Sequence, residues 1–146
     1  MMPLSDEAVL AALPGVPISR DNVEHYRGLL DRRLLLNRCS DCGYWIYPHR
    51  PLCPQCLSWN VSATEVSGEA RIFMFTLIHQ ERDPHGRLLE PLPVAAIELN
   101  EQPGLRYLAT IVNCPTDQIA VDMPVRLVWT ERDGLAWPAF EPTDRR

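Results

Sequence analysis

The amino-acid sequence predicts a mainly β protein in which N-terminal helices and a zinc ribbon precede a small antiparallel barrel or sandwich. Two observations favour this class: two closely spaced cysteine pairs lie before residue 60, and short apolar stretches separated by turn residues recur after it. A third observation is the content of 14 prolines, which is too high for an all-helical protein. Such a content suits short strands joined by turns.

The composition is that of an ordinary folded protein. The 146 residues are 46% hydrophobic and 23% charged, which suits one or two small domains. No apolar run approaches the roughly 20 residues of a membrane helix. The N-terminus has no basic region followed by an apolar stretch, so we expect a cytoplasmic protein that binds no membrane. The net charge of −5, with an arginine at every one of the 14 basic positions, disfavours nonspecific nucleic-acid binding.

Residues 1–36 are predicted to form an N-terminal helical segment. Ser5 can cap a first short helix over residues 5–13. A second helix is expected to start at Asp21, with Glu24 as its capping-box partner and an apolar stripe at three- and four-residue spacing. Three arginines are interpreted as a solvated face of this helix, with packing on a partner subunit as the alternative: Arg27, Arg32 and Arg33.

Four of the five cysteines form two Cys-x2-Cys pairs, and residues 37–60 around them are predicted to form a zinc ribbon. Two such pairs on opposing turns can present four thiolates in a tetrahedron, so the predicted zinc ligands are Cys39, Cys42, Cys53 and Cys56. Two alternatives are a pair of disulfides, which the expected cytoplasmic location disfavours, and a rubredoxin-type iron site. A site closed by four cysteines has no open position for substrate, so the predicted role of the metal is structural.

Residues near the first cysteine pair are expected to support the metal site. Gly43 directly follows the second ligand and allows a tight turn with its amides toward the sulfurs. Four further residues are predicted to cover the site and exclude water: Tyr44, Trp45, Tyr47 and Pro48.

Residues 61–146 are predicted to form the barrel. Its expected strands lie between turn residues and span 63–66, 71–79, 94–100, 107–112 and 125–130. Phe73 and Phe75 stand at alternate positions, so they are predicted to share one face and to belong to the core. The connection over residues 80–91 is long and charged, which is typical of functional loops. His79 before it is interpreted as a plain strand-end histidine, with a role at a shared active site as the alternative.

The sequence contains no recognisable catalytic machinery. None of the four histidines is spaced from another as metal ligands are, and there is no nucleophile elbow, phosphate loop or zinc-protease helix. Cys114 has no base predicted beside it and is interpreted as an inert thiol. We therefore predict no catalytic residue, and a chain that is not catalytic alone; no cofactor-binding residue can be assigned.

An ordered set of motifs extends over residues 22–142. In the first half these motifs are Leu-Leu-Leu-Asn-Arg-Cys at 34–39, Cys-Gly at 42–43, Pro-His-Arg-Pro at 48–51 and Cys-Pro-Gln-Cys at 53–56. In the second half they are Val-Ser-Gly at 66–68, Leu-Pro-Val-Ala-Ala-Ile-Glu-Leu at 92–99, Met-Pro-Val at 123–125 and Pro-Ala-Phe-Glu-Pro at 138–142. The set resembles the acyl-CoA-associated zinc-ribbon/OB-fold family, whose members are small partner subunits of thiolase-like enzymes. Asp122 departs from the pattern, because the family usually has a glycine there; aspartate tolerates left-handed backbone angles better than most residues.

This resemblance implies a rubredoxin-like zinc ribbon followed by an OB-fold barrel. It also implies a non-catalytic accessory subunit that binds and stabilises a thiolase-fold enzyme acting on acyl-CoA thioesters. Known contexts of the family are ketothiolases, acyltransferases, hydroxymethylglutaryl-CoA synthesis and retro-aldol cleavage of steroid side-chain CoA esters. Among these we favour a retro-aldol lyase of steroid degradation, a branch of lipid metabolism. We further expect structural Zn²⁺, a two-plus-two heterotetramer and a CoA thioester at the shared interface.

Two other functions remain as alternatives. The first is a single-stranded nucleic-acid-binding zinc-ribbon/OB module, which would need a basic groove and exposed aromatics that the acidic composition disfavours. The second is an independent CoA-thioester enzyme, which turnover by the isolated chain would reveal. The preferred prediction is an accessory subunit that binds no nucleic acid.

Overall fold

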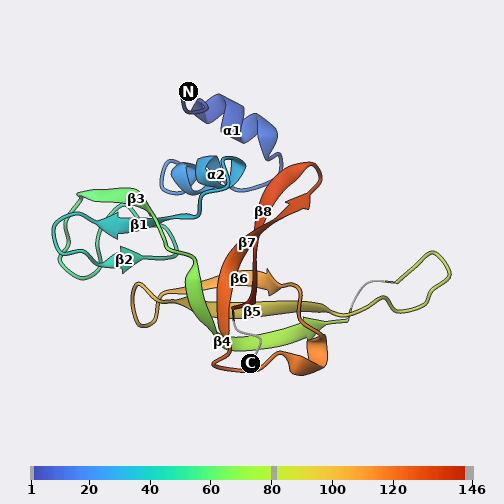
Figure 1. Cartoon of the computed structure of the whole chain (residues 1–146). Helices are drawn as coiled ribbons and strands as arrows, with labels where there is room; N and C mark the ends of the chain where they lie inside the picture. Colours follow the sequence, from blue (N-terminus) through green and yellow to red (C-terminus); the bar gives the residue numbers. More distant parts are fainter. Residues whose placement is uncertain (1, 80–81, 144–146) are drawn as a thin grey trace. The chain divides into compact units, whose positions relative to one another are not determined.

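The computed structural model of the protein describes residues 2–79 and 82–143. Its elements are α1 (Asp6–Ala12), α2 (Val23–Leu30), β1 (Leu35–Cys39), β2 (Trp45–Ile46), β3 (Val61–Glu65), β4 (Glu69–Ile78), β5 (Leu92–Leu99), β6 (Arg106–Ile111), a 3₁₀ turn at Thr116–Gln118, β7 (Pro124–Arg132) and β8 (Leu135–Pro142) (Figure 1). Strands β2, β1 and β3 form a three-stranded sheet, and the other five close into a barrel in the order β4-β5-β6-β8-β7. The predicted fold class is confirmed. None of the described helices is long and apolar enough to cross a membrane.

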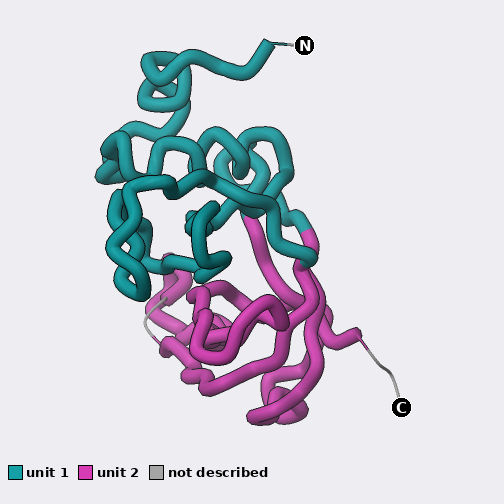
Figure 2. The backbone as a smooth tube through the Cα atoms, turned by 90° about the vertical axis from the view of Figure 1, so that its left-hand side faces the viewer, with its two compact units in different colours: residues 1–67, 129–137 teal, residues 68–128, 138–146 magenta. Residues whose placement is uncertain are grey.

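The chain divides into two units (Figure 2). The first comprises residues 1–67 and 129–137, and so holds both helices, the three-stranded sheet and the adjoining ends of β7 and β8. The second comprises residues 68–128 and 138–146 and holds the rest of the barrel. The three-part division at 1–36, 37–60 and 61–146 remains a prediction.

The N-terminal helix is capped as predicted, because the Ser5 hydroxyl accepts a hydrogen bond of 3.2 Å from the Ala8 amide. Arg27 on α2 is not part of a solvated face, which corrects the prediction for this arginine. Its guanidinium donates to the Leu4 carbonyl at 2.7 Å and pairs with Asp6 and Glu24. Only 14% of the Arg27 side chain is exposed, so this residue fastens α1 to α2.

Helix α2 begins two residues later than the predicted start at Asp21. Asn22 is the N-cap residue, but its side chain makes no capping bond within the helix. The side chain instead accepts from the Ser19 amide at 2.8 Å and donates to the Pro17 carbonyl at 3.1 Å. The predicted capping box is therefore wrong, because the side chain that precedes the helix binds the incoming loop and Glu24 pairs with Arg27.

The barrel core follows the two-residue period of its strands. On β5 the side chains of Ala95, Ile97 and Leu99 are buried while the residues between them are partly exposed. Buried side chains from the other strands complete this core: Ala70, Ile72, Tyr107, Ile111, Val125, Ala139 and Phe140.

A β-bulge on β4 breaks the predicted alternation. The register with β5 shifts between Ile72 and Met74, so Phe73 points outward and is 41% exposed. Phe75 pairs with the buried Ala95 and lies on the other face. The prediction that Phe73 and Phe75 share a core face is therefore wrong, because the bulge inserts one residue into the period.

Strand β8 was not among the predicted strands. Its segment contains Pro138 and Pro142, and proline normally argues against a strand interior. Only a short parallel ladder joins β8 to β6, at Ala139 and Phe140. The buried Glu141 follows, and its carboxylate accepts from Asn113 at 2.6 Å and from Arg126 at 2.8 Å. Strand β8 is also hydrogen-bonded to β7, its other neighbour in the barrel, and this polar cluster adds side-chain bonds to those backbone pairings.

In the turn before β7, Asp122 has the left-handed backbone conformation that a glycine at this position in the family pattern suggests. Its φ angle is +69°, and its amide donates to the Ile72 carbonyl at 2.8 Å. Left-handed angles cost an L-residue roughly 1–2 kcal/mol, less for aspartate, and cost glycine nothing.

We therefore expect Asp122→Gly to raise the free energy of unfolding by roughly 0.5 kcal/mol, because relief of the left-handed angle outweighs the added chain entropy of glycine. Asp117→Gly is the matched control, since Asp117 lies in the 3₁₀ turn and has no positive φ angle. That control should lose about 0.5–1 kcal/mol. Urea unfolding with saturating Zn²⁺ measures both values, and a destabilised Asp122→Gly variant would show that the aspartate side chain, not its backbone, matters here.

Candidate functional site

The two cysteine pairs lie on turns with the same backbone geometry. In the first turn the Gly43 amide donates to the Cys39 carbonyl at 2.9 Å, and in the second the Leu57 amide donates to the Cys53 carbonyl at 2.9 Å. Gly43 has a φ angle of +79° and Leu57 one of +64°. Each turn thus ends in a left-handed residue four positions after its first cysteine. Glycine marks this position in the first pair, whereas nothing in the sequence marks Leu57.

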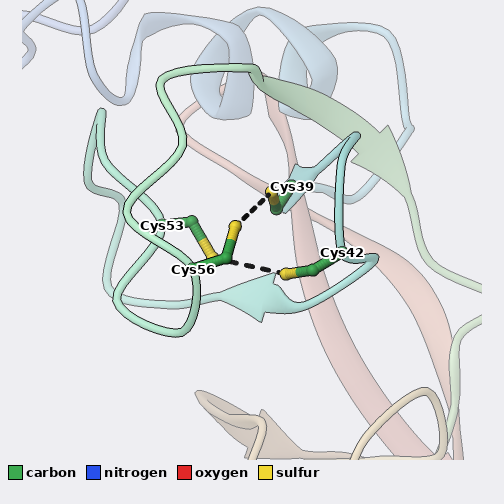
Figure 3. A group of neighbouring side chains, drawn as sticks. All are labelled: Cys39, Cys42, Cys53 and Cys56. Atoms are coloured by element: carbon green, nitrogen blue, oxygen red, sulfur yellow. Dashed lines mark hydrogen bonds between the residues drawn. The ribbon is translucent and has the colours of Figure 1, made fainter.

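The four cysteine side chains converge from these turns (Figure 3). All four sulfur atoms lie within 4.8 Å of one another. The Sγ atoms of Cys39 and Cys56 are 3.6 Å apart, and so are those of Cys42 and Cys53. Four Zn–S bonds of ~2.3 Å in a tetrahedron place the sulfurs about 3.8 Å apart, so the donor set and its spacing fit zinc. Cys39 and Cys53 are buried, whereas Cys42 and Cys56 face solvent.

The surroundings of the four thiols shift the pKa of Cys39 and the pKa of Cys56 in opposite directions. A hydrogen bond from the Cys42 amide is the main reason why the pKa of the Cys39 thiol falls to about 7. The Ser58 amide acts in the same sense on Cys56, but desolvation and the three neighbouring cysteines outweigh it and raise the pKa of that thiol to about 12. Four adjacent thiolates repel one another, so only a cation among them allows all four to lose their protons.

Polar side chains fasten the two turns to each other. Asp41, between the first two cysteines, accepts from the Ser58 hydroxyl and from the Asn60 side-chain amide at 3.1 Å. The Asn60 backbone carbonyl also accepts a hydrogen bond of 2.8 Å from the Ser40 amide. Sequence reasoning missed these residues; a polar residue inside the first turn and two more just after the second were the available signal. The contacts fix the spacing between the turns, and thereby that of the sulfurs.

The predicted cover over the metal site is only partly as expected. Tyr44 packs against the buried Cys39 and Cys53 together with Ile46 and Val61. Trp45 instead contacts Arg38, whose guanidinium carbon lies 4.8 Å from the indole ring centroid and whose Nε donates to the Gly43 carbonyl at 3.0 Å. Tyr47 packs against His49, with ring centroids 5.2 Å apart.

Two histidines that are distant in sequence meet beneath the small sheet. The rings of His25 and His49 are 4.8 Å apart, and His25 Nδ1 lies 2.9 Å from the Leu35 carbonyl. Burial, opposed by that hydrogen bond, lowers the pKa of His25. Burial and the neighbouring His25 lower the pKa of His49 to about 4. His49 Nε2 is buried and has no hydrogen-bond partner among the described residues, which adds to the cost of protonating this ring.

The remaining candidate residues lie outside the four-cysteine cluster. Cys114 is half-exposed, and its thiol lies 3.5 Å from the Pro115 carbonyl. His79 and His85 are exposed. Of the predicted functional loop 80–91, residues 80 and 81 lie outside the described residues. Residues 82–91 contain a turn in which Asp83 accepts from the backbone amides of His85 and Arg87.

A hollow of about 860 Å³ opens on the first unit. Its lining carries charges of both signs, with Arg20 beside Asp21 and Glu24, and includes the exposed Trp59. This mixture does not single out an anionic ligand, so the hollow assigns no CoA-binding residue.

Comparison with known families matches most of the chain. Residues 27–61 match the rubredoxin-like zinc ribbon domain of ChsH2, and residues 63–130 match the C-terminal OB-fold domain of ChsH2. A solved structure described as an Ltp2-ChsH2(DUF35) aldolase is similar to this chain, with a TM-score of 0.77 and 32% identity. The similarity covers 88% of this chain and 99% of that chain.

Three relatives extend this picture. A DUF35 domain-containing scaffold protein of Pyrococcus furiosus is 30% identical over 70% of this chain and 76% of its own length. A probable enoyl-CoA hydratase alpha subunit of Thermomonospora curvata is 34% identical over 90% of this chain and 40% of its own length. A 3-oxo-4,17-pregnadiene-20-carboxyl-CoA hydratase alpha subunit of Mycobacterium tuberculosis is 29% identical over 86% of this chain and 39% of its own length. The chain thus spans about 40% of the length of these two hydratase subunits.

The convergence of the sulfurs predicts that Cys42→Ser abolishes tight zinc binding, since a hydroxyl does not replace a thiolate ligand. Zinc content measured by inductively coupled plasma mass spectrometry should fall from one ion per chain to a small fraction of one. Cys114→Ser is the matched control and should keep its zinc, because Cys114 lies outside the cluster. Full zinc content in Cys42→Ser would contradict a four-cysteine site.

The buried histidines predict a loss of stability in mild acid. An unfolded histidine titrates near 6.5, whereas the pKa of folded His49 is about 4. As the pH falls from 6.5 towards 4, the unfolded chain therefore binds the proton first and the free energy of unfolding decreases. His49→Gln removes this contribution, so its unfolding free energy should decline less between pH 7 and pH 5 than that of the parent chain. The exposed His85→Gln serves as control; parallel curves for all three proteins would refute the prediction.

Proposed function

The chain belongs to the DUF35 family of zinc-ribbon and OB-fold proteins, and we propose that it is a non-catalytic accessory subunit of an enzyme that acts on acyl-CoA thioesters. The observation that carries this proposal is its likeness to a solved chain of the Ltp2-ChsH2(DUF35) aldolase over nearly the whole of that chain. The description of that structure names Ltp2 and ChsH2 together as one aldolase. The names of two further relatives describe alpha subunits of CoA-ester hydratases.

The proposed metal centre supports a structural role. We propose Cys39, Cys42, Cys53 and Cys56 as the ligands of a zinc ion that holds the two turns together. Zinc bound by four thiolates has no open position to polarise a substrate or to activate water. The chemistry of the complex would then reside in the partner, and this chain would supply a folded surface that positions and stabilises it.

The finer form of the proposal concerns the partner and its substrate. We propose a thiolase-fold partner in a two-plus-two heterotetramer, with retro-aldol cleavage of a steroid side-chain CoA ester as the reaction. The aldolase relative favours this chemistry, and the steroid-CoA name of the Mycobacterium tuberculosis relative favours this class of substrate. Placement of the CoA thioester at the shared interface belongs to the same proposal.

Affinity purification of the tagged chain from its native host, followed by native mass spectrometry, tests the proposal. We expect a thiolase-fold enzyme in stoichiometric amount, with CoA-ester cleavage by the complex at least tenfold above that of either component. The mass of the intact complex reports its stoichiometry directly, and zinc-depleted protein serves as the control that should lose the partner.

Recovery of the zinc-bearing chain alone, with turnover of CoA esters by itself, would replace the accessory role with an enzymatic one. Tight, salt-dependent binding to a single-stranded oligonucleotide would instead favour the nucleic-acid module.

A further inference from the structure

The outer face of the barrel carries a row of apolar side chains where alternation normally places polar ones. On β5 the outward positions include Leu92, Val94 and Ala96, as the burial pattern of the strand shows. Strand register places Met74 of β4 and Leu108 of β6 on either side of Ala96. Paired residues share a face of a sheet, so these five side chains form one continuous strip across three strands.

The bulge on β4 enlarges this strip. Because the register shifts between Ile72 and Met74, the two consecutive residues Phe73 and Met74 both face outward. We define the outer strip as Phe73, Met74, Leu92, Val94, Ala96 and Leu108. Its large side chains are substantially exposed: Phe73 by 41%, Leu92 by 51%, Met74 by 57% and Leu108 by 66%. A contiguous patch of exposed apolar side chains commonly marks an interaction surface, whereas single exposed apolar side chains are normal.

A charged row borders the strip at one end. Register aligns Arg71, Glu98 and Arg106 on the same outer face. The Arg106 guanidinium forms an ion pair of 3.3 Å with the Glu98 carboxylate. The central carbon of the same guanidinium lies 3.5 Å from the ring centroid of Phe73. Arg71 has no carboxylate partner among the described residues. The strip is thus an apolar surface with one cation left free at its border.

These charges distinguish among the possible occupants. Single-stranded nucleic acid needs several free cations and stacking aromatics, whereas the strip has one aromatic ring, already covered by Arg106, and one free cation. A second copy of this chain carries the same net charge of −5, which opposes self-association. A different protein with an apolar patch bordered by a carboxylate complements both the strip and Arg71.

We propose that the outer strip is the surface on which the chain docks its partner enzyme, with an acidic side chain of that enzyme opposite Arg71. This inference rests on the proposed function and adds to it the face of the barrel that makes the contact. Burial of the four large exposed side chains supplies the apolar centre of the interface. The ion pair between Arg71 and the acidic side chain of the partner fixes how the two proteins are aligned.

The test uses the thiolase-fold enzyme that co-purifies with the parent chain. We expect Leu108→Asp to weaken binding of this enzyme at least tenfold in biolayer interferometry, because it places a charge on the most exposed of the strip's large side chains. Arg71→Glu should weaken binding less, and more strongly at low than at high salt. Val121→Asp is the matched control and should bind like the parent chain, since Val121 is 57% exposed in the same unit but lies outside the strip.

A second measurement does not depend on how well the aspartate variant folds. A photoreactive benzoylphenylalanine at position 108 should crosslink to the partner enzyme, whereas the same group at position 121 should not. Unchanged affinity of a folded, zinc-loaded Leu108→Asp variant would overturn the assignment of this face, and so would crosslinking from position 121 alone. A homodimer of the parent chain that Leu108→Asp dissociates would assign the strip to a second copy instead.

The two proposals fail in different ways. If the parent chain recovers no thiolase-fold enzyme, the proposed function itself is wrong. If it recovers that enzyme and the strip variants recover it equally well, the accessory role stands and only the docking face is refuted.

Discussion

The convergence of four thiols is the constraint on which the first half of the molecule depends. The sheet beside it has a central strand of five residues, one partner of five and one of only two, too little backbone pairing to be stable alone. The segment between the cysteine pairs contains only that two-residue strand. A metal ion that binds all four sulfurs would add to the small apolar core around Cys39, Ile46 and Cys53, because its binding free energy is available only to the folded arrangement. The Asp41 bonds to Ser58 and Asn60 then fix the turns on which the sulfurs stand.

The barrel needs no such help. Its inward side chains follow the strand period and include the fully buried Ile72, Ile97, Val125 and Phe140. The buried Glu141 is neutralised by Arg126 and receives an additional bond from Asn113. Apolar burial therefore stabilises both units, through Leu29, Leu34 and Leu36 in the first, and metal binding would act on the first alone. Because the barrel core is complete, the apolar side chains of the outer strip are not required to hold the barrel together and remain available for another protein.

The parts of the fold that could be predicted from the sequence are those set by local rules. The cysteine spacing indicated the ribbon, Ser5 indicated the first helix, and apolar stretches between turn residues indicated most barrel strands. What sequence reasoning missed depends on contacts between distant residues. In the sequence Arg27 cannot be told from a solvated arginine, because its partners Leu4 and Asp6 are more than 20 residues away. The sequence of β8 predicts a proline-broken segment, because the Glu141 contacts that help to hold it come from distant residues, Arg126 on β7 and Asn113 after β6. The outward turn of Phe73 follows from a one-residue bulge, and no local signal in β4 announces where the period shifts.

The candidate site divides in the same way, and the division bears on function. All four predicted metal ligands meet, because their spacing alone brings each pair onto one turn. The histidine pair was missed, since His25 and His49 belong to different elements and come together only through the packing of α2 on β1. His25 is buried, and the Nε2 atom of His49 is buried as well, so these nitrogens lack the solvent access that a general base needs. The four clustered thiols and the histidine pair are thus placed for structural roles rather than for catalysis. Among the surfaces that the described residues leave exposed is an apolar barrel face bordered by Arg71, which suits binding a protein better than transforming a substrate.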